Sequence, residues 1–64
     1  MLTVKELKER NAQRIRELQY QANMIHRDLC ACISRDFLKK GDVYMFTFWA
    51  NASREYERRA REVS

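Results

Sequence analysis

One histidine and two cysteines are the side chains in this chain best suited to hold a metal ion. His26 and Cys30 are four residues apart and share a face of a helix, so two copies related by a dimer axis could offer two imidazoles and two thiolates to a tetrahedral ion. One copy supplies only two ligands, whereas structural zinc sites use four, and a lone histidine beside a cysteine on a helix is more often a packing feature. We therefore predict no metal and no other cofactor.

Nucleophilic catalysis would need a cysteine, a base to activate it and a third group to orient the base. His26 could serve only Cys30, and Asp28 lies on another face of the helix. No glycine-rich phosphate loop and no paired carboxylates in an apolar setting are visible. Cys30 and Cys32 point to nearly opposite faces and cannot bridge each other, so reduced thiols are expected. The sequence predicts a protein without enzymatic activity.

A cluster of arginines near the end of the chain could bind an anion. Its members are Arg54, Arg58, Arg59 and Arg61, interleaved with Tyr56. Arginine donates two parallel hydrogen bonds to phosphate, so nucleic acid or a small anionic ligand such as a nucleotide is one candidate partner. Three glutamates lie among the arginines, however, and the net charge is +4, from 13 basic and 9 acidic residues. A solvated helical face is the simpler interpretation.

The elements that position these residues must be helices. The 64 residues include no Pro and a single Gly, and good helix formers are plentiful. Thr3 and Glu6 form a capping box, with Leu2 and Leu7 placed as a hydrophobic staple. The only strong turn spans residues 37–42, where lysines close one helix, Gly41 follows them and an Asp can cap the next. We predict helices over residues 4–39 and 43–62, with 34–36 as a weaker alternative break.

Apolar residues recur on both predicted helices in steps of three and four, which is typical of coiled coils. The first seam is Leu7, Asn11, Ile15, Leu18, Ala22, Ile25, Leu29 and Cys32 or Ile33, and the second is Met45, Trp49, Ala52, Tyr56, Ala60 and Val63. Folded back antiparallel, the shorter helix would reach to about Leu18 or Gln21. We expect Val4, Leu7 and Ile15 to lack a partner within the chain.

Residues 43–50, VYMFTFWA, hold most of the aromatic mass. As a helix this stretch is apolar all round, so one neighbouring helix cannot cover it and we expect burial by several. Its propensity also suits a β-strand, but no second strand is available to pair with it. The lysines before it could suggest a membrane anchor, yet a core role explains the run better.

Together these patterns predict an all-α protein, a single domain over residues 1–64, folded as an antiparallel hairpin with a long first and a shorter second helix. The uncovered apolar surface predicts self-association, with a homodimeric four-helix bundle as the leading arrangement. Asn11 could fix the register of that bundle or lie at a frayed, hydrated end. The association residues expected are Leu7, Ile15, Leu18, Tyr44, Phe46, Phe48 and Trp49.

The expected function is that of a non-enzymatic adaptor or inhibitor that binds another protein. The alternative is binding of nucleic acid or a nucleotide through the arginine cluster. The chain's small size is compatible with a phage accessory protein that blocks a host factor. The first residues are charged and amphipathic rather than signal-like, and no apolar run approaches the roughly 18 residues of a membrane span, so a cytoplasmic location without membrane contact is expected.

Overall fold

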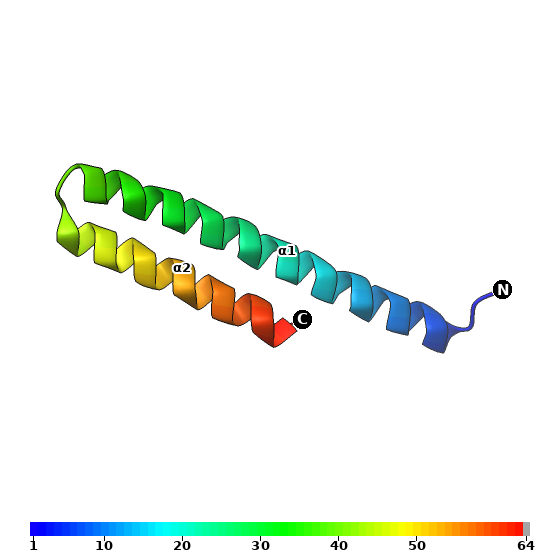
Figure 1. Ribbon diagram of the computed structural model, residues 1–64. Helices are drawn as coiled ribbons and strands as arrows, with labels where there is room; N and C mark the ends of the chain where they lie inside the picture. The colour runs from blue at the N-terminus through cyan, green and yellow to red at the C-terminus, as the bar shows by residue number, and fades with distance from the viewer. Residues whose placement is uncertain (64) are drawn as a thin grey trace.

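The computed structural model describes residues 1–63, which form two helices, α1 (Val4–Lys39) and α2 (Val43–Val63). Figure 1 shows α2 folded back alongside α1 as an antiparallel hairpin, with the N-terminal part of α1 extending beyond the end of α2. The Cα trace measures 59 × 15 × 10 Å. The predicted all-α class, the antiparallel hairpin and the unequal helices of 36 and 21 residues are confirmed.

The start of α1 forms as its sequence predicts. The Thr3 side chain oxygen accepts a hydrogen bond of 3.2 Å from the backbone N–H of Glu6, and its carbonyl accepts one of 3.0 Å from the N–H of Leu7. The first bond satisfies one of the four amide groups that a helix start leaves without an intrahelical partner, and the second is the first intrahelical bond of α1. Thr3 is therefore the N-cap of α1.

The turn between the helices is a Schellman motif followed by an N-cap. Gly41 has a φ of +79°, a left-handed conformation that residues with a Cβ rarely adopt. Its N–H donates to Leu38 and the N–H of Asp42 donates to Phe37, both at 3.0 Å. Asp42 then accepts a 3.1 Å hydrogen bond from the N–H of Met45 through its carboxylate. The turn thus ends α1 and starts α2 within three residues.

The alternative break near residue 34 is wrong, because α1 is continuous to Lys39. The Ser34 hydroxyl donates a 2.7 Å hydrogen bond to the carbonyl of Ala31, one turn earlier. A serine that bonds back to its own helix need not cap a new one. Ser34 is also buried, so its small side chain lies in the contact between the helices.

The contact between α1 and α2 is built around small side chains. Cys30, Ser34 and Ala60 are buried, at 6%, 5% and 1% exposure. The α1 residues that are buried or half-buried are Asn23, Met24, Arg27, Cys30, Ala31, Ile33, Ser34 and Phe37, and five of them recur in steps of four and three: Asn23, Arg27, Cys30, Ser34 and Phe37. We call this recurring set the inner seam. Because its central members are small, the two helices approach closely and leave little room between them for large apolar groups.

The first predicted seam does not face α2. Leu18, Ile25 and Leu29 are 58%, 60% and 55% exposed, and Ala22 and Cys32 are exposed too, whereas Ile33, the alternative last member of the seam, is half-buried. The inner seam is shifted from the predicted seam by one to two residues, which is roughly 150° around a helix axis. The predicted seam consequently lies on the side of α1 away from α2. Val4, Leu7 and Ile15 are exposed, as expected, but the later residues of this seam from Leu18 to Leu29 are exposed as well.

The second predicted seam, by contrast, does face α1, and each of its residues from Met45 to Val63 is buried or half-buried. The remainder of the aromatic stretch is open, since Val43, Tyr44 and Phe48 are 64%, 80% and 56% exposed. The stretch is helical, as predicted, and α1 covers one side of it. Complete burial of residues 43–50 does not occur within the chain.

Candidate interaction surfaces

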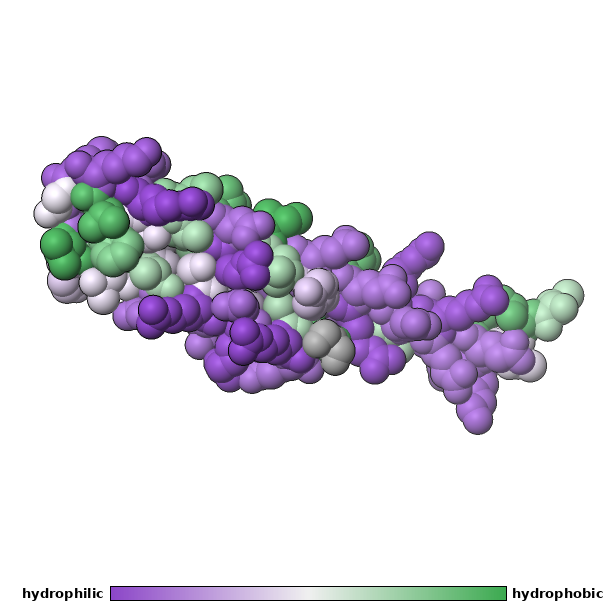
Figure 2. Space-filling view, in the orientation of Figure 1, coloured by the Kyte–Doolittle hydropathy of each residue, from purple (hydrophilic) through white to green (hydrophobic). Residues whose placement is uncertain are grey.

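The outer edge of α1 carries a stripe of large apolar side chains, which we call the outer stripe. Its members are between 47% and 60% exposed, and they are Leu7, Ile15, Leu18, Ile25 and Leu29. Figure 2 shows hydrophobic residues emerging at intervals along the edge of α1 that lies away from α2, whereas most of the face toward the viewer is hydrophilic. The structure thus places the predicted association residues Leu7, Ile15 and Leu18 on one continuous exposed line.

The overhanging part of α1 is polar on the side that continues the inner seam. Carried toward the N-terminus in steps of three and four, that seam reads Tyr20, Arg16, Gln13, Glu9 and Glu6. An open hollow of about 490 Å³ lies where α2 ends, and its lining of Gln13, Arg16, Glu17, Tyr20, Gln21 and Val63 is mostly polar. The inward side of the overhang therefore does not have to be covered by the α2 helix of a second chain. Its apolar side chains lie in the outer stripe.

The other predicted association residues lie in the first turns of α2. Tyr44 and Phe48 are exposed, while Phe46 and Trp49 are half-buried. The Phe48 and Trp49 rings meet edge to face with centroids 5.4 Å apart. The indole N–H of Trp49 is buried and has no hydrogen-bond partner among the described residues. Together with Leu38 and Val43 on either side of the turn, Tyr44 and Phe48 form an exposed apolar end to the hairpin.

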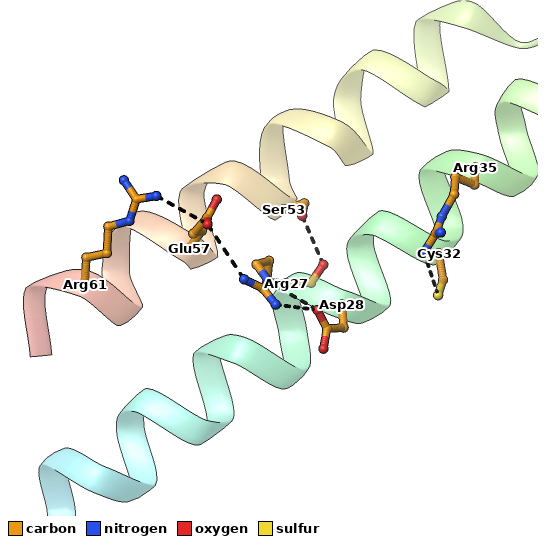
Figure 3. A network of polar contacts seen from close by, with 7 residues as sticks. All are labelled: Arg27, Asp28, Cys32, Arg35, Ser53, Glu57 and Arg61. Carbon is orange, nitrogen blue, oxygen red and sulfur yellow. Dashed lines mark hydrogen bonds and ion pairs between the residues drawn. The ribbon is translucent and has the colours of Figure 1, made fainter. Parts of the chain in front are cut away.

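A polar network connects the two helices on another side (Figure 3). The guanidinium of Arg27 on α1 lies 3.7 Å from the carboxylate of Glu57 on α2, and 2.9 Å from that of its neighbour Asp28. Arg61 approaches the same Glu57 oxygen at 3.4 Å. The Ser53 hydroxyl donates a 3.0 Å hydrogen bond to the backbone carbonyl of Arg27. These contacts fix the register of the hairpin on its polar side.

The predicted anion-binding arginines are on the exposed surface of α2, and three of them pair with glutamates of the same helix. Arg58 binds Glu55 and, at 2.6 Å, Glu62, and Arg59 approaches Glu55 at 3.5 Å. The hydrogen bond from Arg58 is the main cause of a lowered pKa at the Glu55 carboxyl, and its counterpart raises the pKa of Arg58. Glu55 with Arg59 and Glu57 with Arg61 are ion pairs between residues four apart on α2.

Of the four, Arg54 is exposed and makes no ion pair with the described residues. Arg59 lies over the ring of Tyr56, with 5.3 Å between its guanidinium carbon and the ring centroid. The glutamates thus neutralise much of the charge of this cluster, and Arg54 is the member whose charge has no local partner. A phosphate group would have to compete with carboxylates at the other positions.

The residues weighed for metal binding and catalysis are dispersed. His26 stacks on Tyr56 of α2, with ring centroids 5.0 Å apart. Cys30 is buried and Cys32 exposed, and both thiols are free. Arg35 approaches the Cys32 sulfur at 3.6 Å. Within residues 1–63, no group of three or more His, Cys, Asp or Glu side chains is placed to hold a metal ion. His26 takes part in the packing of α1 on α2.

Two residues that position the hairpin, Arg27 and Ser53, are not singled out by the search for apolar periodicity. The usable signal is a second set of positions on α1 at the same spacing as the apolar seam but with small residues at its centre, namely Cys30 and Ser34. Small residues on both helices indicate close approach, and Ser53 and Ala60 on α2 match them. A search that scores positions by hydrophobicity alone gives small residues less weight than large apolar ones.

Comparisons with protein-family models, with curated proteins and with solved structures found no match to this chain. Within residues 1–63, neither helix is long and apolar enough to cross a membrane.

Proposed function

We propose that this protein is a non-enzymatic helical interaction protein that self-associates into a helical bundle and binds another protein, as an adaptor or inhibitor. The outer stripe is the observation that carries the proposal. It holds five large apolar side chains, each about half exposed, on the side of α1 opposite α2. Complete burial of such a side chain stabilises a protein by about 1.5–3 kcal/mol, so covering the stripe offers a substantial driving force for association.

The apolar end of the hairpin supports the second half of the proposal. Tyr44 and Phe48 project beside the turn, away from the overhang, so a partner could contact them while another chain covers the outer stripe. Aromatic residues of this kind frequently dominate the energy of protein interfaces. Two free cysteines are consistent with a reducing compartment such as the cytoplasm.

Light scattering across a concentration series tests self-association. We expect the mass to rise above the 7.8 kDa of one chain, and Leu18→Glu to return it to that value because a charge would replace an apolar contact. Asn51→Glu, at an exposed position of α2, is the matched control and should leave the mass unchanged. A folded 7.8 kDa species at every concentration would contradict self-association.

Binding of another protein is tested separately by capture from the native host with the wild type and with Tyr44→Ala plus Phe48→Ala. We expect the double variant to keep the oligomer mass but to lose the captured protein. Capture that is undiminished in the double variant would exclude the apolar end as the binding surface.

The second candidate function is binding of nucleic acid or a nucleotide by the arginine cluster, which the unpaired charge of Arg54 favours. Replacing Arg58 and Arg61 by Glu should abolish such binding without changing the oligomer mass. Binding should also weaken as salt rises, since phosphate contacts release counterions. Salt-insensitive binding would contradict this candidate.

A further inference from the structure

All members of the outer stripe except Leu7 belong to a regular heptad seam that runs nearly the whole length of α1. Steps of four and three connect its positions without interruption, and every position is exposed in the single chain. We call this set the outer seam, and its members are Val4, Lys8, Asn11, Ile15, Leu18, Ala22, Ile25, Leu29, Cys32 and Asp36. An unbroken seam of this kind fits a second straight helix packed along it. α2 cannot be that helix, because it occupies the inner seam on the other side.

We infer that the outer seam binds the α1 helix of a second copy of this chain, antiparallel, about a two-fold axis at the level of Tyr20. This inference rests on the self-association proposed above and specifies its surface and direction. In this register the residue numbers of facing seam positions add to 40. The two α1 helices form the centre of the assembly, and each α2 stays on the outer side of its own α1.

The fit of the apolar side chains supports this register. Ile15 faces Ile25 of the second copy, and Leu18 faces Ala22, so a large side chain meets a small one beside the axis. Residues 4–36 overlap completely, which is about 50 Å at ~1.5 Å per residue. Leu29 faces Asn11 in this register. Sliding one helix by a heptad in one direction would place Ile25 against Lys8 of the second copy, and sliding it in the other direction would keep apolar partners for Ile25 and Leu29 but bring Arg14 beside Arg35.

Charge complementarity decides the direction. Arg14 and Asp28 flank the seam at equivalent heptad positions, and the antiparallel register places each beside the other residue of the second copy, so the pair occurs twice. A parallel pairing would instead place Lys8 against Lys8 and Asp36 against Asp36. Asp28 is accessible, with its side chain 69% exposed and paired only with the adjacent Arg27 at 2.9 Å. Opposite charges at these flanking positions set partner orientation in coiled coils.

A charge-reversal cycle tests the pairing. Arg14→Asp and Asp28→Arg should each raise the Kd of self-association about tenfold, or ~1.4 kcal/mol, since two attractive pairs become repulsive in each variant. The double variant should restore the wild-type Kd. Arg10→Asp makes the same charge change on another face of α1 and should have little effect. Failure of the double variant to recover would overturn the register.

A crosslinking experiment reads the direction independently. With Cys30 replaced by Ala, two Cys32 thiols in the antiparallel pair are about 36 Å apart along the axis at ~1.5 Å per residue, so a short thiol crosslinker should not join them. Adding Lys8→Cys creates a thiol opposite Cys32 of the second copy, and crosslinked dimers should then form. A Cys32–Cys32 crosslink in the variant without Lys8→Cys would overturn the inference but leave self-association intact. The same holds if a dimer forms and Lys8→Cys does not allow it to be crosslinked. A monomer at all concentrations would overturn both.

Discussion

The Ser53 hydroxyl of α2 donates a 3.0 Å hydrogen bond to the backbone carbonyl of Arg27, 26 residues earlier in α1. This bond and the ion pair between Arg27 and Glu57 join the two helices directly. A side chain as short as serine reaches a backbone carbonyl in the middle of a neighbouring helix only where the two helices approach closely. Ser53 therefore both permits the close approach and fixes its register.

Ser53→Ala is expected to lower the free energy of unfolding by about 1 kcal/mol, the usual net contribution of one hydrogen bond. The Arg27 carbonyl keeps its place in the α1 ladder, so no buried acceptor is left unsatisfied and the loss stays modest. Urea titration measures the change. Thr47→Ala is the control, because the exposed Thr47 hydroxyl bonds within its own helix to Val43 at 2.9 Å. Equal effects of the two substitutions would mean that the Ser53 bond does not hold the helices together.

Ala60→Leu should destabilise the hairpin by about 1–3 kcal/mol, because the Ala60 methyl is 1% exposed and a larger side chain must push α1 away. Thermal unfolding measures the effect. Arg54→Leu introduces the same side chain at an exposed position of α2 and should leave the midpoint nearly unchanged. Matching midpoints for Ala60→Leu and the wild type would show that the helices are not closely packed there.

The helices and the turn could be predicted because their signals are local. Thr3, Gly41 and Asp42 act within three or four residues of their own positions, so the chain needs no knowledge of its partner to form these caps. The lengths of the helices follow from the caps. The α2 seam could also be predicted, since large and small residues coincide on its inward side, from Met45 to Ala60.

The side of α1 that meets α2 could not be chosen from hydrophobicity. α1 has two seams of the same period, and the more apolar one, containing Leu18 and Ile25, is exposed in the chain. The contact with α2 instead follows Cys30 and Ser34, where small size permits close approach. Periodicity identifies a helix face that another helix can cover, but it does not say which helix covers it. In a chain that we propose to self-associate, one seam of α1 forms the contact with α2 and the other forms the interface with another chain.

Substitutions of Trp49 test the energetic cost of its buried indole N–H. Its indole nitrogen is buried without a hydrogen-bond partner in the described part of the chain, and such a group costs about 1–3 kcal/mol. Trp49→Phe removes that N–H while keeping an aromatic ring, so we expect a change within about 1 kcal/mol despite the lost volume. Trp49→Ala should cost at least about 2 kcal/mol, because it also empties the contact with α1. Calorimetry compares the two, and equal losses would mean that the N–H is satisfied in solution.

Acidification should weaken the second half of α2 through Glu55. The pKa of its carboxyl is lowered from the ordinary 4.5 chiefly by the hydrogen bond from Arg58, aided by the charges of Arg58 and Arg59 and opposed by desolvation. A lowered folded-state pKa means that the ion pair stabilises the fold fully above about 4.5, the value in the unfolded chain, and that this contribution disappears as the pH falls through the folded-state pKa.

The urea midpoint of the wild type should therefore exceed that of Glu55→Gln at pH 7, and the difference should begin to shrink near pH 4.5 and vanish once the pH is below the lowered folded-state pKa. Because these side chains are exposed, raising the salt concentration should reduce the same difference at pH 7. Glu9→Gln, on the overhang of α1, makes the same substitution without this arginine partner and should show a smaller difference. A wild-type advantage that persists at low pH would show that Glu55 acts through packing rather than through its charge.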